Sequence, residues 1–114
     1  MNIVFIETES FSKKLPRYMR DEEFSAFQQF LGKNPTVGNV IYKSGGLRKV
    51  RWLGSGKGKR GGLRIIYYYH LLNGEIMLMT IYAKNEAKDL TAEQLKILRQ
   101  EMPKWKKREI LDKK

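Results

Sequence analysis

The sequence predicts an α+β domain in which a strand and two helices precede an antiparallel β-meander and a last helix. Before residue 36 apolar residues recur at helical spacing. After it, runs rich in β-branched and aromatic residues alternate with glycine-rich turns. A helix-start pattern follows at residue 91. Residues 1–114 are expected to form a single compact domain, because no linker or internal repeat divides a chain of this ordinary domain length.

The first third of the chain is predicted to hold one strand and two helices. Residues 2–6 are apolar and β-prone, which predicts a buried strand. Ser10 is expected to cap a short helix that Pro16 disturbs. A longer helix is predicted to begin at Asp21, because aspartate is a good N-cap and acids in the first turn suit the helix dipole. Its core-facing residues are Phe24, Phe27 and Leu31.

Strands are predicted next, over residues 40–42, 47–53, 63–72 and 75–83. The last two are joined through Asn73-Gly74, a strong hairpin signal because both residues tolerate positive φ. The second and third are joined by residues 54–62, a longer basic, glycine-rich loop. These short connections predict that neighbouring strands run antiparallel.

The last helix is predicted to begin at Thr91. Thr91 and Gln94 match a capping box, and Leu90 with Leu95 matches a hydrophobic staple. Residues 91–114 are therefore expected to form a lysine-rich C-terminal helix and tail.

The composition indicates a polyanionic partner. The formal net charge is +11 and the pI is about 10.0, which favours nucleic acid, an anionic membrane or an acidic protein. Without cysteine the chain cannot form disulfides or thiolate zinc sites. Its apolar runs are far shorter than the ~20 residues of a membrane span, and its N-terminus lacks a signal-peptide pattern. We therefore expect a soluble, cytoplasmic protein with no membrane contact.

Most of the excess positive charge lies in one fifth of the chain. Residues 43–64 contain eight basic side chains, no acidic one, and seven of the ten glycines. Glycine lets the backbone approach a ligand closely, so a basic, glycine-rich segment suits a phosphate backbone. A solvated surface loop is the alternative, but such loops usually mix both signs of charge.

Strand alternation gathers several of these cations on one face. Lys49 and Arg51 lie two residues apart and project from the same face, whereas Arg48 projects from the other. The sequence therefore predicts a cationic cluster without obvious partner acids, formed by Lys49, Arg51, Lys57, Arg64 and Lys84. The other cations expected to bind RNA are Lys43, Arg48, Lys59, Arg60 and the lysines of the tail.

Such a cluster can cleave RNA as well as bind it. When a 2′-hydroxyl attacks the adjacent phosphorus, negative charge builds on the non-bridging oxygens, and arginine holds these by bidentate hydrogen bonds. A lysine crowded by other cations loses its proton more readily and can act as a general acid or base. Tyr82, close to Lys84 in the sequence, is a candidate proton donor. This chemistry needs no metal or cofactor.

Other residues with catalytic potential have ordinary interpretations. His70 lies among apolar residues and is interpreted as a strand residue. The tyrosines at 67–69 alternate between two faces, and packing is favoured over stacking on bases. Glu86 and Asp89 have the spacing of a turn or helix start, which favours a surface role. The sequence contains neither metal-ligand spacing nor P-loop spacing.

Three segments, taken in order, resemble one known family. They are GGLRKVRW at 45–52, GKGKRGGLRIIYYY at 56–69 and TIYAKNEAKDLTAEQ at 80–94. Together, on a matching β-α-α-β-β-β-α pattern, they closely resemble the RelE/HigB family of bacterial toxins. The basic GKGKxGG loop resembles the HigB-like branch.

The resemblance implies a RelE-like fold and the toxin half of a type II toxin–antitoxin module. Members enter the ribosomal A site and cut the bound messenger RNA without a metal, with the 2′-hydroxyl as nucleophile. The implied partners are a cognate antitoxin protein and a ribosome with its ribosomal RNA and A-site messenger RNA. Operator DNA is implied only through the antitoxin complex.

The resemblance also implies which residues form the site. Lys49 and Arg51 match the paired basic strand residues of the family. Arg64 matches the arginine that contacts the scissile phosphate in relatives, and Lys84 falls where relatives carry a basic residue.

Two departures leave the general base open. Some relatives carry an arginine directly after the last of these positions, where this chain has Asn85. Some carry a catalytic tyrosine in the last segment, where this chain has Leu90-Thr91. The base is then Lys57 or Lys84, with Tyr82 as a weaker option.

Two further hypotheses remain beside an endoribonuclease. The same basic face suits a non-catalytic RNA- or DNA-binding module, including an inactive toxin homologue that binds an antitoxin. It also suits a module that binds an acidic protein. A cleaved RNA product distinguishes the enzyme from both, whereas salt dependence of binding does not.

Overall fold

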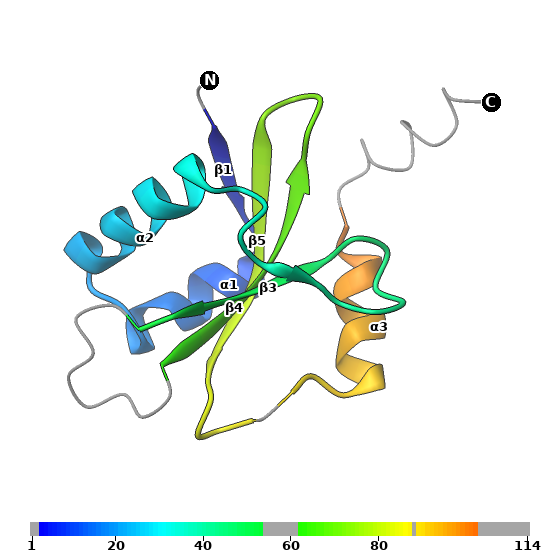
Figure 1. The fold of residues 1–114 in the computed structure, drawn as a ribbon. Helices are drawn as coiled ribbons and strands as arrows, with labels where there is room; N and C mark the ends of the chain where they lie inside the picture. Colours follow the sequence, from blue (N-terminus) through cyan, green and yellow to red (C-terminus); the bar gives the residue numbers. More distant parts are fainter. Residues whose placement is uncertain (1–2, 54–61, 88, 103–114) are drawn as a thin grey trace.

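A computed structural model describes residues 3–53, 62–87 and 89–102 (Figure 1). The elements in order are β1 (Val4–Glu7), α1 (Glu9–Lys14), the 3₁₀ helix η1 (Leu15–Arg17), α2 (Asp21–Lys33), β2 (Asn39–Val40), β3 (Arg48–Trp52), β4 (Leu63–His70), β5 (Glu75–Ala83) and α3 (Ala92–Gln100). This order confirms the predicted α+β class.

One sheet organises the molecule, with strand order β1-β5-β4-β3-β2. Strands β2 to β5 pair antiparallel, as the meander predicted, and β1 pairs parallel with β5. Figure 1 shows α2 and α3 on opposite sides of this sheet. The prediction that the first strand is buried was wrong, because β1 lies at the sheet edge and is only partly covered.

The helices begin near the predicted positions, but two of the three predicted N-cap residues were wrong. Thr8, not Ser10, caps α1, and its hydroxyl accepts a hydrogen bond from the Phe11 N–H at 3.0 Å. The N-cap of α2 is Arg20, which makes no side-chain cap, so Asp21 is the first helical residue. The predicted capping box at Thr91 is confirmed.

The strand bounds needed small corrections. The strand expected over residues 40–42 is Asn39–Val40, and the strand expected to reach residue 72 ends at His70. Residues 71–74 therefore form a longer hairpin loop than a two-residue turn. Within Asn73-Gly74 only the glycine adopts positive φ, at 62°. The basic loop over residues 54–61 and the tail over 103–114 lie outside the described residues.

Two apolar clusters cover the two faces of the sheet. The larger lies toward α2 and includes Phe27, Ile65 and Tyr67. The smaller lies toward α3 and includes Ile66, Met79, Tyr82 and Leu98. Strand alternation divides the side chains between these layers. None of the described helices is long and apolar enough to cross a bilayer.

Candidate functional site

Strands β3, β4 and β5 bring polar side chains from distant parts of the sequence into one row. The register pairs Arg51 with Arg64, and Arg64 with Tyr82. Directly paired residues of antiparallel strands project from the same face. Lys49 shares that face, because it lies two residues before Arg51 and pairs with Ile66 of the α3-side cluster. We call Lys49, Arg51, Arg64 and Tyr82 the basic site.

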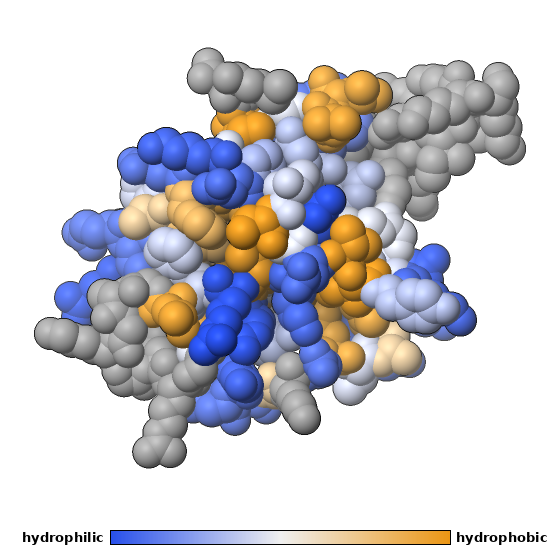
Figure 2. Space-filling view, in the orientation of Figure 1, coloured by the Kyte–Doolittle hydropathy of each residue, from blue (hydrophilic) through white to orange (hydrophobic). Residues whose placement is uncertain are grey.

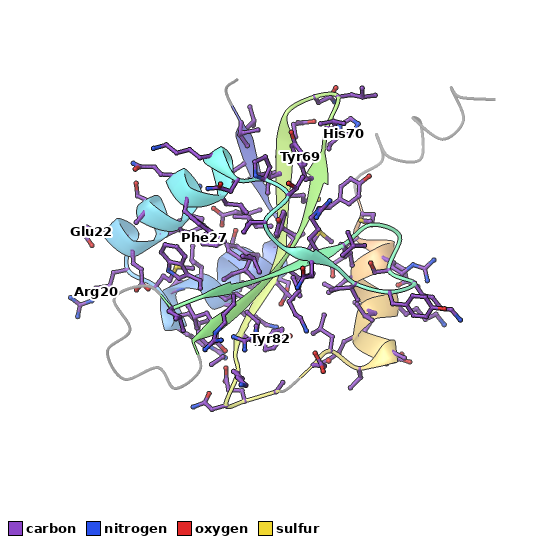
Figure 3. The ribbon with its side chains drawn as sticks, viewed as in Figure 1. Arg20, Glu22, Phe27, Tyr69, His70 and Tyr82 are labelled. Carbon is purple, nitrogen blue, oxygen red and sulfur yellow. The ribbon has the colours of Figure 1, made fainter. Side chains whose placement is uncertain are left out.

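Tyr82 is the most buried member of the basic site, with a side chain that is 8% exposed. Its hydroxyl is buried and has no hydrogen-bond partner among the described residues. Burial is the main cause that raises its pKa, and Asp89 adds to this, while the positive charges of Lys49 and Arg64 oppose it. The phenol therefore keeps its proton at neutral pH, as a proton donor must. Figure 3 shows Tyr82 on the side of the strands that faces the segment leading to α3.

Lys49 has an acidic partner that the sequence analysis did not foresee. Its Nζ lies 2.6 Å from Oδ1 of Asp89, in the segment between β5 and α3. The expectation of a cluster without partner acids was therefore wrong for Lys49. The pair spans 40 residues of sequence, so no local pattern could have indicated it.

Lys84 lies in a turn directly after β5, and the surrounding contacts hold that turn in place. Its backbone N–H donates to the Gly62 carbonyl at 3.2 Å. Oε1 of Glu86 accepts from the Ala83 N–H at 2.9 Å and from the Tyr18 hydroxyl at 2.5 Å. Glu86 is exposed, as predicted for a surface residue, yet it ties this turn to the chain after η1.

Tyr18 and Glu86, which share a hydrogen bond, both have shifted pKa values. The hydrogen bond from Tyr18 is the main cause that lowers the Glu86 pKa, and the bond from the Ala83 N–H adds to it. Burial, followed by the hydrogen bond to Glu86, raises the pKa of Tyr18 to about 12. The bond therefore joins a neutral phenol to a carboxylate over a wide pH range.

Two of the other predicted RNA-binding cations, Arg48 and Lys43, belong to the described part of the chain. Arg48 projects from the opposite face of β3, where its Nη1 donates to the carbonyls of Gly38 at 2.7 Å and Thr36 at 3.2 Å. Lys43 lies in the loop between β2 and β3 with a φ of 56°, and its Nζ is 5.3 Å from the centre of the Tyr42 ring. Tyr42 is 82% exposed and was not singled out from the sequence.

The remaining predictions fall into two groups. Some concern residues outside the described part of the chain, and others concern residues that the structure places. Lys57, Lys59, Arg60 and the tail lysines belong to the undescribed ranges. His70 is a buried strand residue, as expected, at the end of β4 far from Tyr82 (Figure 3). The tyrosine run packs into both clusters, also as expected. Among described residues, no group of three or more histidine or acidic side chains is arranged to hold a metal ion.

The surface over β3 and β4 combines charge with apolar area. Figure 2 shows hydrophilic side chains over these strands in the middle of this face, with apolar patches on either side. A charged strip bordered by apolar surface suits a ligand that carries both phosphates and bases, because phosphates bind cations and bases stack on apolar groups.

Comparison with known proteins supports the fold. No protein-family model matches the sequence. Among solved structures, the chain is similar to the free state of an E. coli toxin RelE mutant in which two arginines are replaced by alanine. The TM-score is 0.54 and the identity is 11%, over 77% of this chain and 90% of that chain. The likeness shows that the chain has a RelE-like fold.

Proposed function

We propose that this protein is the toxin of a type II toxin–antitoxin module and cuts messenger RNA in the ribosomal A site. The row formed by Arg51, Arg64 and Tyr82, with Lys49 beside it, is the observation that carries this proposal. The RelE-like fold supports it, because the similar structure is that of a toxin. We assign the basic loop over residues 54–62 to the HigB-like branch of this fold.

The arginines of the basic site are proposed to stabilise the transition state. Arg51 and Arg64 are neighbours across two strands, so both can bind the non-bridging oxygens of one phosphodiester. These oxygens gain negative charge as the 2′-oxygen attacks the phosphorus. Guanidinium groups held on paired strands need little reorganisation, and loss of one such donor costs about 10²–10³ in rate.

Proton transfer completes the proposed reaction. A lysine among Lys49, Lys57 and Lys84 accepts the proton of the 2′-hydroxyl as the new P–O2′ bond forms. The P–O5′ bond breaks, and the Tyr82 hydroxyl gives its proton to the departing 5′-oxygen. The products are a 2′,3′-cyclic phosphate and a 5′-hydroxyl. Burial raises the pKa of Tyr82, so its proton is held at neutral pH, while the positive charges of Lys49 and Arg64 lower the pKa and favour release of that proton to the departing oxygen.

Cations outside the basic site are proposed to hold the ribosome and its messenger RNA. They are Lys43, Arg48, Lys59, Arg60 and the lysines of the tail. The exposed Tyr42 ring next to Lys43 adds a surface on which an unpaired base can stack. The proposed protein partner is an antitoxin, through which operator DNA is also bound, and the proposed site of action is the cytoplasm.

Substitution of Arg64 tests this function. Messenger RNA integrity is followed by primer extension in a purified translation reaction, with and without ribosomes. We expect wild-type protein to cut only ribosome-bound message, and Arg64→Ala to cut it at least about 10²-fold more slowly. Arg20→Ala is the matched control, because it removes the same charge at the N-cap of α2, away from Tyr82 (Figure 3).

Each alternative function has its own outcome in this assay. Cuts in naked RNA would indicate a ribosome-independent ribonuclease. Tight, salt-sensitive RNA binding without cuts in either reaction would indicate a non-catalytic binding module or an inactive homologue. Equal rates for Arg64→Ala and Arg20→Ala would show that the basic site is not the active site.

A further inference from the structure

A carboxylate lies in the basic site and has no role in the proposed reaction. Oδ1 of Asp89 is 2.6 Å from Nζ of Lys49. The Lys49 side chain is one-third exposed and the Asp89 side chain two-thirds exposed, so the pair lies at the surface of the site. Asp89 belongs to the connecting segment between β5 and α3, whereas Lys49 belongs to β3.

A carboxylate and a phosphodiester bind an ammonium in the same way. Both offer anionic oxygens that accept short, charge-assisted hydrogen bonds from it. A phosphodiester that binds at Lys49 must therefore compete with Asp89 for the same charge. Exposed ion pairs of this kind are weak, which corresponds to a factor of about 1.5 to 5 in affinity.

The Tyr82 hydroxyl, a second polar group of the basic site, is also under the influence of Asp89. The hydroxyl is buried and has no partner among the described residues, so a ligand oxygen reaches it only after a neighbouring group is displaced. The charges that act on it belong to Lys49, Arg64 and Asp89. Of these three residues only Asp89 lies outside the strands, and its side chain is two-thirds exposed, so an incoming ligand can take its place at Lys49 without a change in the sheet.

We propose that Asp89 is a built-in competitor that occupies Lys49 until an RNA phosphodiester displaces it. The inference rests on the proposed function in one respect, namely that the incoming phosphodiester belongs to RNA. Asp89 then acts as a positioning residue, because it holds Lys49 in the free protein and takes no part in bond breaking. The ion pair lowers the affinity of the site for weakly bound anions.

The test measures binding of an RNA that cannot be cut. The probe is a fluorescent 2′-O-methyl oligouridine of twelve nucleotides, titrated with the full chain at several salt concentrations. We expect Asp89→Asn to bind about 1.5- to 5-fold more tightly than the matched control Glu22→Gln. Glu22→Gln makes the same change in net charge, and Figure 3 shows Glu22 on α2, far from Tyr82.

The salt dependence gives a readout that a merely structural role would not change. In the wild type, the released Asp89 takes up a cation when RNA binds, which offsets one released counterion. The slope of log affinity against log salt should therefore steepen by up to about 0.7 in Asp89→Asn and stay unchanged in Glu22→Gln. Asp89→Glu should behave as the wild type.

Two results would overturn the proposal. The first is equal affinity and slope for Asp89→Asn and Glu22→Gln, with unchanged melting temperatures as a check of folding. The second is persistence of the Asp89→Asn effect in a Lys49→Met background, where no competition is possible. The probe has no attacking hydroxyl, so failure of the cleavage assay, which tests the proposed function, leaves this binding test intact.

Discussion

At the scale of single residues, the hydroxyl of Tyr82 is the clearest sign that the site sacrifices stability for function. A buried hydroxyl without a partner costs free energy of folding, because its hydrogen bonds to water are lost and not replaced. Tyr67, a buried tyrosine on the other face of the sheet, shows the usual solution. Its hydroxyl donates to the Pro35 carbonyl at 2.7 Å and accepts from the Gly38 N–H at 3.0 Å. Tyr82 lacks such bonds among the described residues.

The substitution Tyr82→Phe should therefore separate stability from activity. It removes only the unpartnered hydroxyl, so we expect the free energy of unfolding to rise by up to about 1 kcal/mol in urea titrations. Cleavage of ribosome-bound message should fall by about 10²-fold, because the departing oxygen loses its proton donor. Tyr42→Phe, on an exposed loop, serves as the control and should change neither quantity. Full activity of Tyr82→Phe would rule out the proposed acid.

Close packing around residue 38 explains why this residue is a glycine. A Cβ at this position would lie 2.8 Å from the Tyr67 ring and 3.0 Å from the carbonyl oxygen of Lys49. The first contact is with a fully buried side chain and the second is with backbone, so neither neighbour can move easily. Gly38 thus lets the chain before β2 pack against β3 and β4, which carry the basic site.

At the scale of elements, the segment between β5 and α3 contacts the basic site through Asp89 and the chain after η1 through Glu86. It carries Lys84, which is a candidate base, and Asp89, which binds Lys49. Glu86 ties its first turn to Tyr18 after η1, and the capping box of Thr91 fixes its other end at α3. The segment is thus anchored at both ends, while Asp89 between them remains two-thirds exposed.

This anchoring predicts a characteristic pH dependence of stability. The folded-state pKa of Glu86 is lowered, mainly by the Tyr18 hydrogen bond, from its ordinary value of 4.5. The stability it contributes is present above pH 4.5 and is lost as the pH falls through the folded-state pKa. The pKa of Tyr18 is raised from 10.0 to about 12, so its contribution is present below pH 10.0 and is lost as the pH rises toward 12.

Melting temperatures measured across pH check this prediction. We expect Tyr18→Phe to weaken both the acid and the alkaline decline, because it removes the titrating phenol and the hydrogen bond that shifts Glu86. Glu86→Gln should abolish its own part of the acid decline and weaken the alkaline decline in part, because burial alone then raises the Tyr18 pKa. Identical pH profiles for Tyr18→Phe and the wild type would show that the bond does not hold the turn in solution.

At the scale of the whole molecule, the residues that carry the net charge are different from those that stabilise the fold. The formal net charge is +11, yet the two layers that stabilise the sheet are built from ordinary apolar clusters. The excess cations therefore contribute little to folding and repel one another. A polyanionic ligand relieves that repulsion, which favours binding to RNA over a purely structural role.

Association with RNA should accordingly depend steeply on salt. If Lys43, Lys49, Arg51 and Arg64 each contact one phosphate and the released Asp89 takes up one cation, the affinity for a single strand falls roughly 20-fold for a fourfold rise in salt. Fluorescence anisotropy with the uncleavable oligouridine measures this slope. A nearly flat dependence would mean that these cations do not meet phosphates and would favour an uncharged ligand surface.

The sequence by itself determined the fold class, the order of the elements, the antiparallel meander and the shared face of Lys49 and Arg51. These properties depend on local periodicity, on capping chemistry such as Thr91 with Gln94, and on the two-residue repeat of a strand. The resemblance to the RelE/HigB family added Arg64 and Lys84 as candidate site residues. The sequence also identified Tyr82 as a candidate acid from its position near Lys84.

Only the tertiary structure decided which distant groups meet. The register of β3 with β4 and β5 set Arg51, Arg64 and Tyr82 in one row. The path of the chain after β5 brought Asp89 to Lys49, and the apolar cluster that includes Leu98 of α3 buried Tyr82. These outcomes depend on contacts between residues tens of positions apart. The free energy of such contacts comes from the packing of whole layers, which leaves no local signal in the sequence.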